Sequence, residues 1–425
     1  MRHEMKLDRL PDSASFVSDA VEACVHCGFC LPTCPTYRVL GQEMDSPSGR
    51  IVLVKGVFEG AFPMADAVPH LDACLGCLAC VTSCPSGVRY DRLLLGFRSA
   101  TRNTGARPMA GRIRRRVLLH TLPYPRRLAA MARVGRLARP ARRIAPSIVR
   151  PMLDLLPDRM PEAKPLPATY PATGPRRARV ALLSGCVQQV LAGDINWATI
   201  RVLSRNGVEV VIPRAQGCCG ALAMHIGELG VARKQAATNL RAFPSDVDAV
   251  ISNAAGCGSA LKEYGDLFAG RDEQDDAQRF AASAKDISTF LDELGITPPP
   301  ALVEPRRVAY HDACHLSHAQ KVTEAPRRLL AQVPGLELVE VPDREICCGS
   351  AGTYNIEQPA TATALGAGKA AAIASVRPDV VALGNIGCMI QIRAHLGGIG
   401  AAIPVMHTVE VLDRAYRQEA LPRSR

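Results

Sequence analysis

Two runs of cysteines with identical spacing lie 50 residues apart near the N-terminus. They are Cys24-x2-Cys27-x2-Cys30-x3-Cys34-Pro35 and Cys74-x2-Cys77-x2-Cys80-x3-Cys84-Pro85. Three thiols separated by two residues can bind one face of an iron–sulfur cube, and in two-cluster ferredoxins the cysteine before proline ligates the other cube. The spacing therefore predicts two [4Fe–4S] clusters that exchange their fourth ligands. One cluster takes Cys24, Cys27, Cys30 and Cys84, and the other takes Cys34, Cys74, Cys77 and Cys80.

Disulfides and zinc are weaker explanations of the same cysteines. A disulfide framework needs an oxidising compartment, and residues 1–6 carry no apolar signal segment. Zinc sites pair CxxC units or mix cysteine with histidine, and they do not require a third evenly spaced thiol or a repeated Cys-Pro. The chain has 16 cysteines and no apolar run long enough to span a membrane. We therefore expect metal ligation in the cytoplasm.

The net charge of +11 is concentrated in one segment. Residues 101–150 contain fourteen arginines and no aspartate or glutamate, so the rest of the chain is slightly acidic. Leucine, valine and methionine recur among these arginines at near-helical spacing, which predicts a pair of basic amphipathic helices. Such a face can lie on anionic lipid at the cytoplasmic side of the inner membrane or dock an acidic partner subunit, and a solvated connector is the alternative. The candidate docking residues are Arg114, Arg115, Arg116, Arg126 and Arg127.

Nucleic acid is not expected as a partner of this segment. Tyr124 is its only aromatic residue, so few side chains are present to stack on bases. Neither helix-turn-helix nor zinc-finger spacing occurs.

A proline-rich stretch follows the basic segment. Six prolines between residues 157 and 175 interrupt any helix and favour an extended, semi-rigid spacer. The expected organisation is a two-cluster ferredoxin-type domain, mostly helical, over residues 1–100, an arginine-rich helical connector over 101–156 and a linker over 157–178.

The C-terminal part repeats internally. Cys186, the pair Cys218-Cys219 and Cys257 recur as Cys314, Cys347-Cys348 and Cys388, at offsets of 128, 129 and 131 residues. Predicted strands cover 179–184, 208–212, 247–251, 308–310, 336–341 and 379–383, and predicted helices cover 194–205, 230–243 and 359–375. Alternating strands and helices indicate βαβ units with a mainly parallel sheet. We expect two cysteine-rich α/β domains, at 179–300 and 301–425, in a chain that is α+β overall.

Glycine-rich turns after the predicted strands carry these later cysteines, and such strand ends are the usual place for chemistry in open α/β sheets. Three histidines surround one of them, in His311-Asp-Ala-Cys314-His315-Leu-Ser-His318. We expect strand-end histidines bonded to backbone, with metal ligation or proton transfer as the alternative. After the first cysteine run, Asp45 or Ser46 is predicted to cap a helix, and Arg50 is predicted to be a solvated surface residue, with tuning of cluster charge as the alternative.

These motifs together resemble a known family. Cys347-Cys-Gly-Ser-Ala-Gly-Thr-Tyr354, Ser317-His-Ala-Gln-Lys321 and Cys84-Pro-Ser-Gly-Val-Arg-Tyr90 look like signatures of the iron–sulfur subunits of 2-hydroxyacid oxidoreductases, above all those of glycolate oxidases. The resemblance covers nearly the whole chain.

The resemblance implies a heteromeric complex. An FAD-binding partner would oxidise glycolate to glyoxylate, or D-lactate to pyruvate, and this chain would pass electrons to a quinone of the membrane respiratory chain without touching the substrate. Leu365-Gly-Ala-Gly-Lys369 lacks the third glycine of a dinucleotide fingerprint, so we expect no flavin here. Lactate, glycerol-3-phosphate and heterodisulfide complexes are alternatives, as is an iron–sulfur regulatory protein that binds nucleic acid.

The chain departs from the family's fuller pattern, which ends each cysteine-rich half with CxxC. Ala260 and Gln391 stand where the last cysteines would be. Four thiols per half suit one further iron–sulfur cluster or a zinc ion, and a reduced thiol group is the alternative. The candidates are Cys186, Cys218, Cys219 and Cys257 in one half, and Cys314, Cys347, Cys348 and Cys388 in the other.

Overall fold

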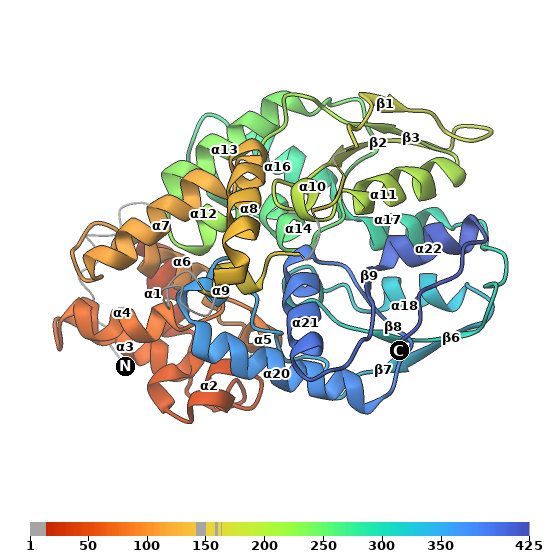
Figure 1. The fold of residues 1–425 in the computed structure, drawn as a ribbon. Helices are drawn as coiled ribbons and strands as arrows, with labels where there is room; N and C mark the ends of the chain where they lie inside the picture. The colour runs from red at the N-terminus through yellow and green to blue at the C-terminus, as the bar shows by residue number, and fades with distance from the viewer. Residues whose placement is uncertain (1–13, 142–149, 158–159, 163, 425) are drawn as a thin grey trace.

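The computed structural model describes residues 14–141, 150–157, 160–162 and 164–424, and shows helices at the N-terminal end of the molecule and two sheets at the other (Figure 1). The N-terminal elements are α1 (Ala14–Glu22), α2 (Pro35–Leu40), η1 (Glu43–Asp45), α3 (Pro47–Glu59), α4 (Met64–Asp72), α5 (Ala79–Thr82) and α6 (Tyr90–Ala100). The cysteines of both runs therefore lie in short loops between helices, except Cys80, which lies in α5. The overall class is α+β, as predicted.

Apolar faces of α1, α3, α4 and α6 form the core of this part. Val54, Leu71 and Leu93 are completely buried in it, and Phe58 meets Phe97 edge to face with ring centroids 6.4 Å apart. Ser46 caps α3 because its Oγ accepts a 3.0 Å hydrogen bond from the Gly49 amide. The predicted cap is therefore confirmed, and it fixes where the chain turns after the first cysteine run.

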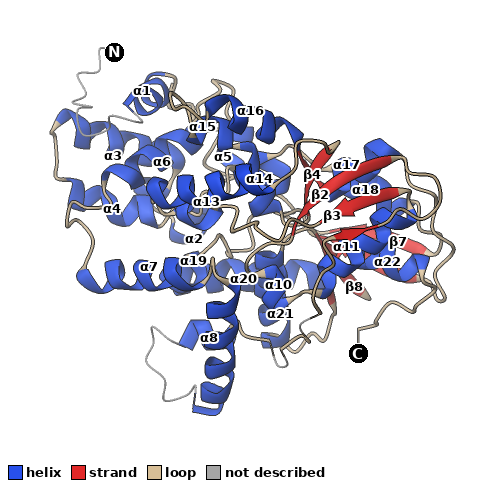
Figure 2. Cartoon of the chain, turned by 90° about the horizontal axis from the view of Figure 1, so that it is seen from above, coloured by secondary structure: helices blue, strands red, loops and turns tan. Residues whose placement is uncertain are grey.

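The predicted basic helix pair is present as α7 (Met109–Thr121) and α8 (Pro125–Ala138), followed by η2 (Arg139–Ala141) and α9 (Arg150–Asp154). The end of α8 projects from the body of the molecule (Figure 2). Residues 142–149 of the predicted connector, like 1–13 of the first domain and 158, 159 and 163 near the linker, lie outside the described residues. Among the described helices, none has the length and apolarity needed to cross a bilayer.

The first cysteine-rich half contains a five-stranded sheet of order β1-β3-β2-β4-β5. Its strands are β1 (Thr169–Tyr170), β2 (Ala178–Leu183), β3 (Val208–Val211), β4 (Ala249–Ser252) and β5 (Ala284–Asp286). β2, β3, β4 and β5 are parallel, and β1, which comes from the proline-rich stretch, pairs antiparallel with β3. The helices are α10 (Gln188–Leu191), α11 (Asp194–Arg205), α12 (Ala221–His225), α13 (Leu229–Ala242), α14 (Ala255–Lys262), α15 (Tyr264–Leu267), α16 (Gln274–Ser283) and α17 (Ile287–Leu294).

The second half repeats the parallel part of this arrangement in a sheet of order β7-β6-β8-β9. Its strands are β6 (Arg306–Tyr310), β7 (Leu336–Glu340), β8 (Val380–Leu383) and β9 (Val405–His407), and its helical elements are η3 (His315–Ala319), α18 (Glu324–Ala331), α19 (Tyr354–Glu357), α20 (Pro359–Ser375), α21 (Ile386–Gly398) and α22 (Thr408–Tyr416). The predicted duplication is confirmed, because β3-β2-β4-β5 and β7-β6-β8-β9 have the same order. β5 and β9, of three residues each, were not predicted.

The two halves meet at the carboxyl ends of their central strands. The Ala255 amide donates to the Gly384 carbonyl over 3.0 Å, and the His407 ring lies 2.8 Å from the Asn253 carbonyl. Buried residues of both sheets belong to one continuous apolar core. The carboxyl ends of both sheets, which carry the later cysteines, therefore face each other.

Candidate iron–sulfur and thiol sites

The four cysteines of the first predicted ligand set lie together near the surface of the N-terminal part, where Cys27 is exposed. Cys24, Cys27, Cys30 and Cys84 line one small pocket, together with Cys80 of the other set. Burial raises the pKa of Cys24, and the neighbouring Cys84 and Cys27 thiols raise it further. The four thiols thus lie within electrostatic reach of one another, with Cys84 arriving from the second run.

The second predicted set lies deeper. Burial raises the pKa of Cys80 well above the usual thiol value, and Cys77, Cys74 and Cys34 follow as causes. Two hydrogen bonds reach a sulfur of this set from the surrounding chain. They run to the Cys74 Sγ from the Gly76 amide over 3.3 Å and from the Tyr90 hydroxyl over 3.7 Å.

The loops that hold these sets depend on left-handed backbone. Gly28 and Gly76 have φ of 81° and 62°, and His26 and Leu78 adopt positive φ as well. This conformation turns the chain tightly enough for cysteines three residues apart to face a common centre. Thiols in two groups of four, with donors aimed at sulfur, fit a pair of [4Fe–4S] clusters.

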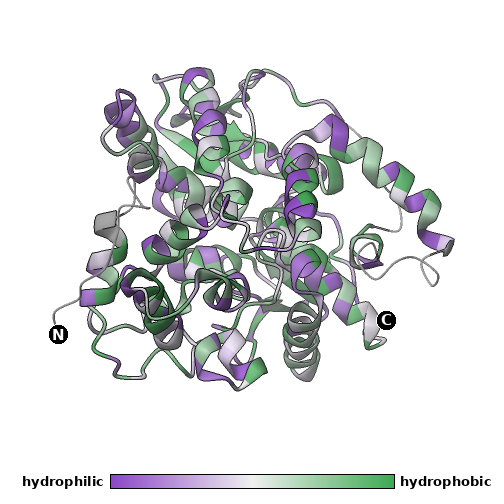
Figure 3. Cartoon of the chain, turned by 90° about the vertical axis from the view of Figure 1, so that its left-hand side faces the viewer, coloured by the Kyte–Doolittle hydropathy of each residue, from purple (hydrophilic) through white to green (hydrophobic). Residues whose placement is uncertain are grey.

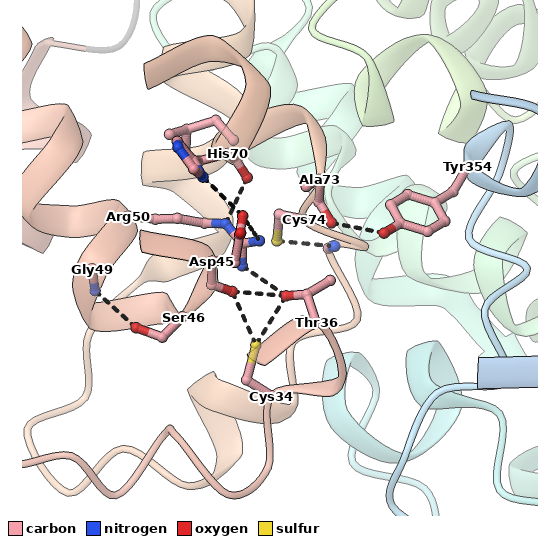
Figure 4. Close-up of polar contacts among 12 residues, drawn as sticks. Cys34, Thr36, Asp45, Ser46, Gly49, Arg50, His70, Ala73, Cys74 and Tyr354 are labelled. Atoms are coloured by element: carbon pink, nitrogen blue, oxygen red, sulfur yellow. Dashed lines mark hydrogen bonds and ion pairs between the residues drawn. The ribbon is translucent and has the colours of Figure 1, made fainter. Parts of the chain in front are cut away.

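Arg50 lies between these loops, so its prediction as a solvated surface residue is wrong. The side chain is completely buried, and it donates to the His70 carbonyl over 2.7 Å and to the Thr36 Oγ over 3.0 Å (Figure 4). Burial opposes its charge, but the nearby Cys74, Tyr90, Cys34 and Asp45 raise its pKa above the usual arginine value. Arg50 therefore places a permanent positive charge beside the second ligand set.

Side chains from other parts of the chain clamp the Cys74 loop. Buried Arg98 of α6 donates to the carbonyls of Leu71 and Cys74 over 2.9 and 2.6 Å. The same guanidinium donates to the carbonyl of His225, at the end of α12, over 2.7 Å. Tyr354 of α19 donates to the Ala73 carbonyl over 2.9 Å. The N-terminal loop is thus fixed by residues of both cysteine-rich halves.

Thiols of the first cysteine-rich half form one group after β2, β3 and β4. Cys186 and Cys218 lie 3.5 Å apart, and Cys219 is bonded to both Cys218 and Cys257. The hydrogen bonds from Cys186 and Cys219 hold the pKa of Cys218 well below the usual value, whereas the Cys218 bond raises the pKa of Cys186. These hydrogen bonds therefore favour the thiolate of Cys218 over those of Cys186 and Cys219.

In the second half, Cys314 and Cys347 lie 3.6 Å apart, and Cys348 is bonded to Cys347 and Cys388. The hydrogen bond with Cys347, followed by burial, raises the pKa of Cys314 well above the usual value. Asn385 donates to the Cys388 Sγ over 3.3 Å. All four predicted thiols of each half are thus brought together.

The N-terminal sites and the second half are in direct contact. Cys77, Cys314, Cys347 and Tyr354 belong to one small buried cluster. After burial, the Cys314 thiol is the largest cause of the raised pKa of Cys77. The second N-terminal ligand set and the thiols of the second half are therefore immediate neighbours.

A cavity of about 770 Å³ lies between the two halves and is covered by α8 and α9. Leu128, Met131, Val134 and Leu153 give the cover an apolar surface. The thiols of both halves line the opposite walls: Cys186, Cys218, Cys219 and Cys257, and Cys314, Cys347, Cys348 and Cys388. The apolar face of the basic connector thus forms one wall of a cavity that both thiol groups line.

The predicted docking arginines divide into two kinds. Arg116, Arg126 and Arg127 are exposed, and Arg114 is half-buried. Arg115 instead forms ion pairs with Glu357 at 3.0 Å and Asp72 at 3.1 Å, and its side chain is only 15% exposed. Its guanidinium is therefore engaged inside the molecule and unsuited to docking.

Two of the three histidines around Cys314 differ in their environment. His318 is bonded to the Thr82 hydroxyl at 3.1 Å and lies 3.2 Å from the Glu345 carbonyl, in partial agreement with the backbone bonding predicted for it. The ring nitrogens of buried His311 have no hydrogen-bond partner among the described residues, so the prediction was wrong for that ring.

Comparison with known proteins places this geometry in a family. Residues 20–88 match the family described as 4Fe-4S dicluster domain, and residues 180–262 and 308–393 match the Cysteine-rich domain family (CCG). The lactate utilization protein A of Geobacillus thermodenitrificans (strain NG80-2) is 33% identical over 236 residues, which cover 55% of this chain and 98% of that protein. A crystal structure of a hypothetical protein from Helicobacter pylori gives a TM-score of 0.54 at 10% identity over 87% of this chain and 67% of that one, a likeness of fold alone.

One relative matches from end to end. The glycolate oxidase iron-sulfur subunit of Escherichia coli (strain K12) is 36% identical over 427 aligned residues, which cover 99% of this chain and 100% of that protein. With both cysteine runs and both cysteine-rich halves in place, the chain belongs to the family of glycolate oxidase iron–sulfur subunits.

Proposed function

We propose that this chain relays electrons from an FAD-binding partner, which oxidises glycolate to glyoxylate and D-lactate to pyruvate, to a quinone-type acceptor. The observation that carries the proposal is an unbroken series of thiol sites. Cys80 of the second set lines the pocket of the first set, and Cys77 of the second set lies beside Cys314. When bound, [4Fe–4S] clusters supply one-electron transfer, so the two electrons of a reduced flavin can leave singly.

Residues around the thiol sites hold these sites in position and supply charge beside them. Arg98 and Tyr354 hold the Cys74 loop against the cysteine-rich halves. Arg50 supplies a fixed positive charge near Cys34 and Cys74, which offsets the negative charge of bound clusters. The thiol groups of the two halves line the cavity, and Cys77 beside Cys314 brings the second N-terminal set next to it.

The cavity supports a quinone as the acceptor. Its volume falls in the range of small-molecule sites, and its cover is apolar, as the ring face and the hydrocarbon tail of a quinone require. His225 lines it. Arg98 is a donor only and faces the Nδ1 of this ring at 3.4 Å, so Nε2 carries the hydrogen, and Nε2 has no partner among the described residues. This N–H is suited to donate to a quinone carbonyl.

The exposed side of the connector supports attachment at the membrane surface. Met109, Ile113 and Val117 of α7 are exposed by 62, 56 and 47%, and Leu137 of α8 by 84%. Hydrophobic and hydrophilic residues are interleaved along helices in the side view of Figure 3. Exposed apolar residues beside Arg116, Arg126 and Arg127 form the kind of face that binds anionic lipid.

Anaerobic reconstitution tests the proposed function. The purified chain is mixed with the FAD-binding subunit, and glycolate or D-lactate is added. We expect the iron–sulfur absorption to bleach and the EPR signals of reduced clusters to appear, while a Cys27→Ser, Cys77→Ser double variant shows neither. A short-chain quinone should then reoxidise the wild type, and more slowly the His225→Leu variant.

Two results would contradict the proposal. Clusters that dithionite reduces but neither substrate does, in the presence of the flavoprotein, would refute the electron donor. Clusters that stay reduced when quinone is added would refute the acceptor.

A further inference from the structure

His311 has a buried imidazole whose ring nitrogens find no hydrogen bond within the described part of the chain. It follows β6, is 1% exposed, and neither Nδ1 nor Nε2 has a hydrogen-bond partner among the described residues. A buried polar group without a partner carries a large desolvation cost, so such groups in native proteins usually bind a water or an ion. A neutral imidazole offers a ring nitrogen as a metal ligand.

Two thiols share the pocket of this ring. One ligand atom each from His311, Cys348 and Cys388 lie within 4.8 Å of one another, and all three residues are buried. Ligands of one tetrahedral ion are separated by distances of this order, since zinc binds sulfur at about 2.3 Å and nitrogen at about 2.0 Å. The three groups therefore surround a point where a single ion fits.

The duplicated half shows that this arrangement is not a by-product of the fold. Gly220 and Gly349 have the same φ of 87°. A Cβ atom added to Gly220 would meet Ala232, and one added to Gly349 would meet Ala362, so these positions align the two halves. Counting from the first cysteine after each strand, His311 corresponds to Leu183. The first half thus keeps the thiols and replaces the imidazole with an apolar side chain.

A buried cation accompanies the imidazole in the second half only. Lys369 of α20 is 3% exposed and donates to the Asp343 carbonyl over 2.7 Å. Burial lowers the pKa of Lys369, whereas the nearby Cys348 and Cys347 thiols raise it. At the corresponding position of the first half, Asn239 bonds the Gly217 amide and the Cys218 carbonyl. Lys369 is therefore placed to balance thiolates at the second site.

We propose that His311, Cys348 and Cys388 bind one divalent ion of the zinc class. Mixed nitrogen and sulfur ligands with tetrahedral spacing suit zinc. The cysteine pattern lacks one thiol at Gln391, and the His311 imidazole supplies a ligand in its place. Asn385 orients Cys388 by its 3.3 Å hydrogen bond to the sulfur. The remaining position is open to Cys347, which is bonded to Cys348, or to a molecule from the cavity. The inference rests on the proposal that the C-terminal thiols bind metal, and not on electron transfer.

Metal analysis of the full-length chain tests the site. Protein made with zinc and iron both supplied, and purified anaerobically, is assayed for zinc, iron and acid-labile sulfide, and its zinc absorption edge is recorded. The wild type should hold one zinc per chain with nitrogen and sulfur neighbours. His311→Leu, which copies the first half, should lose the zinc and keep the iron and sulfide. His318→Asn is the matched control, because that ring is already bonded, and it should keep both metals.

Three outcomes would overturn the site. One is a wild-type chain without zinc. Another is a His311→Leu variant that keeps its zinc with an unchanged absorption edge. The third is a His311→Leu variant that loses iron and sulfide, which would make the centre an iron–sulfur cluster. Retained EPR signals of the N-terminal clusters show that each variant is folded, and glycolate-driven reduction, measured separately, reports on the proposed function alone.

Discussion

The hydroxyl of Tyr354 donates a 2.9 Å hydrogen bond to the carbonyl of Ala73, the residue before Cys74. Tyr354 closes the motif that begins at Cys347-Cys348, so the bond ties the thiols of the second half to an N-terminal cysteine loop (Figure 4). The two kinds of cysteine site are therefore positioned by one another, and not by their own segments alone.

Removing this bond should loosen the Cys74 loop. Tyr354→Phe deletes one hydroxyl and leaves the ring packing, so the local cost should be about 1 kcal/mol. Iron should leave one of the two N-terminal clusters faster when a chelator is added, as followed by absorbance. Tyr124→Phe, on the exposed connector, should match the wild type. Equal rates for Tyr354→Phe and wild type would mean that the bond does not restrain the loop.

Arg50 should affect both stability and redox potential. Breaking a buried ion pair costs about 3–5 kcal/mol, so Arg50→Met should lower the unfolding midpoint strongly. Loss of a positive charge beside Cys34 and Cys74 should also lower the midpoint potential of one cluster in an EPR-monitored titration. Arg50→Lys should restore much of the potential, and Arg89→Met, on an exposed pair, should change neither quantity. An unchanged potential in Arg50→Met would exclude the electrostatic role.

The exchange of fourth ligands can be read from paired variants. Cys84→Ser should remove the same EPR signal as Cys27→Ser, because these thiols line one pocket. Cys34→Ser should remove the same signal as Cys77→Ser, because the Cys34 and Cys77 thiols both lie close enough to Cys80 to raise its pKa. If Cys34→Ser instead copied Cys27→Ser, each run would hold its own cluster.

The connector should bind anionic vesicles. A basic residue near a charged bilayer contributes about 1 kcal/mol, so the double variant Arg116→Gln, Arg126→Gln should bind about thirty-fold more weakly in a sedimentation assay. Binding should fall as salt rises, and Leu137→Ser should weaken it too. Arg241→Gln, exposed on α13, serves as the control. Equal binding to zwitterionic and anionic vesicles would rule out the electrostatic contact.

Asp286 should make stability depend on pH. Burial raises its pKa to about 6 from the ordinary 3.8, although its Oδ1 accepts from the Ser288 amide over 2.8 Å at the cap of α17. A raised folded-state pKa gives stability that is complete below about pH 4 and is lost as pH rises through 6, by about 3 kcal/mol.

Asp286→Asn keeps the cap and removes the titration. The variant should therefore unfold at a higher temperature than the wild type at pH 7 and at a similar one at pH 4, in thermal scans across this range. A constant difference between the two proteins at every pH would show that the carboxyl does not titrate on unfolding.

Periodic features of the fold were predictable from the sequence. The helices predicted at 194–205 and 359–375 coincide with α11 and α20. Apolar residues recur at helical spacing in α11, and α20 is rich in alanine, the strongest helix former. β5 and β9 were missed because three residues are too few to show a period, and they are strands only because β4 and β8 offer their edges.

The site residues that the sequence did not reveal were missed for a different reason. Arg50, Arg98, His225 and Lys369 are ordinary helix residues in sequence, and their burial follows from contacts with distant segments. The pairing of Arg115, a predicted docking residue, was missed for the same reason, since Glu357 lies 242 residues away along the chain. Cysteine spacing predicts ligand sets because three of the four ligands of each cluster are close in sequence, whereas the charges around them are assembled only by the fold.

The meeting of the two halves at their strand ends has an evolutionary consequence. Each copy of the repeat supplies one wall of the cavity that α8 and α9 also line, so a substitution in either copy alters the surroundings of the other. A difference between the copies, such as Leu183 in one and His311 in the other, must therefore be compatible with the fit between them. Excising either half as a separate module would expose the apolar interior that the pair keeps covered.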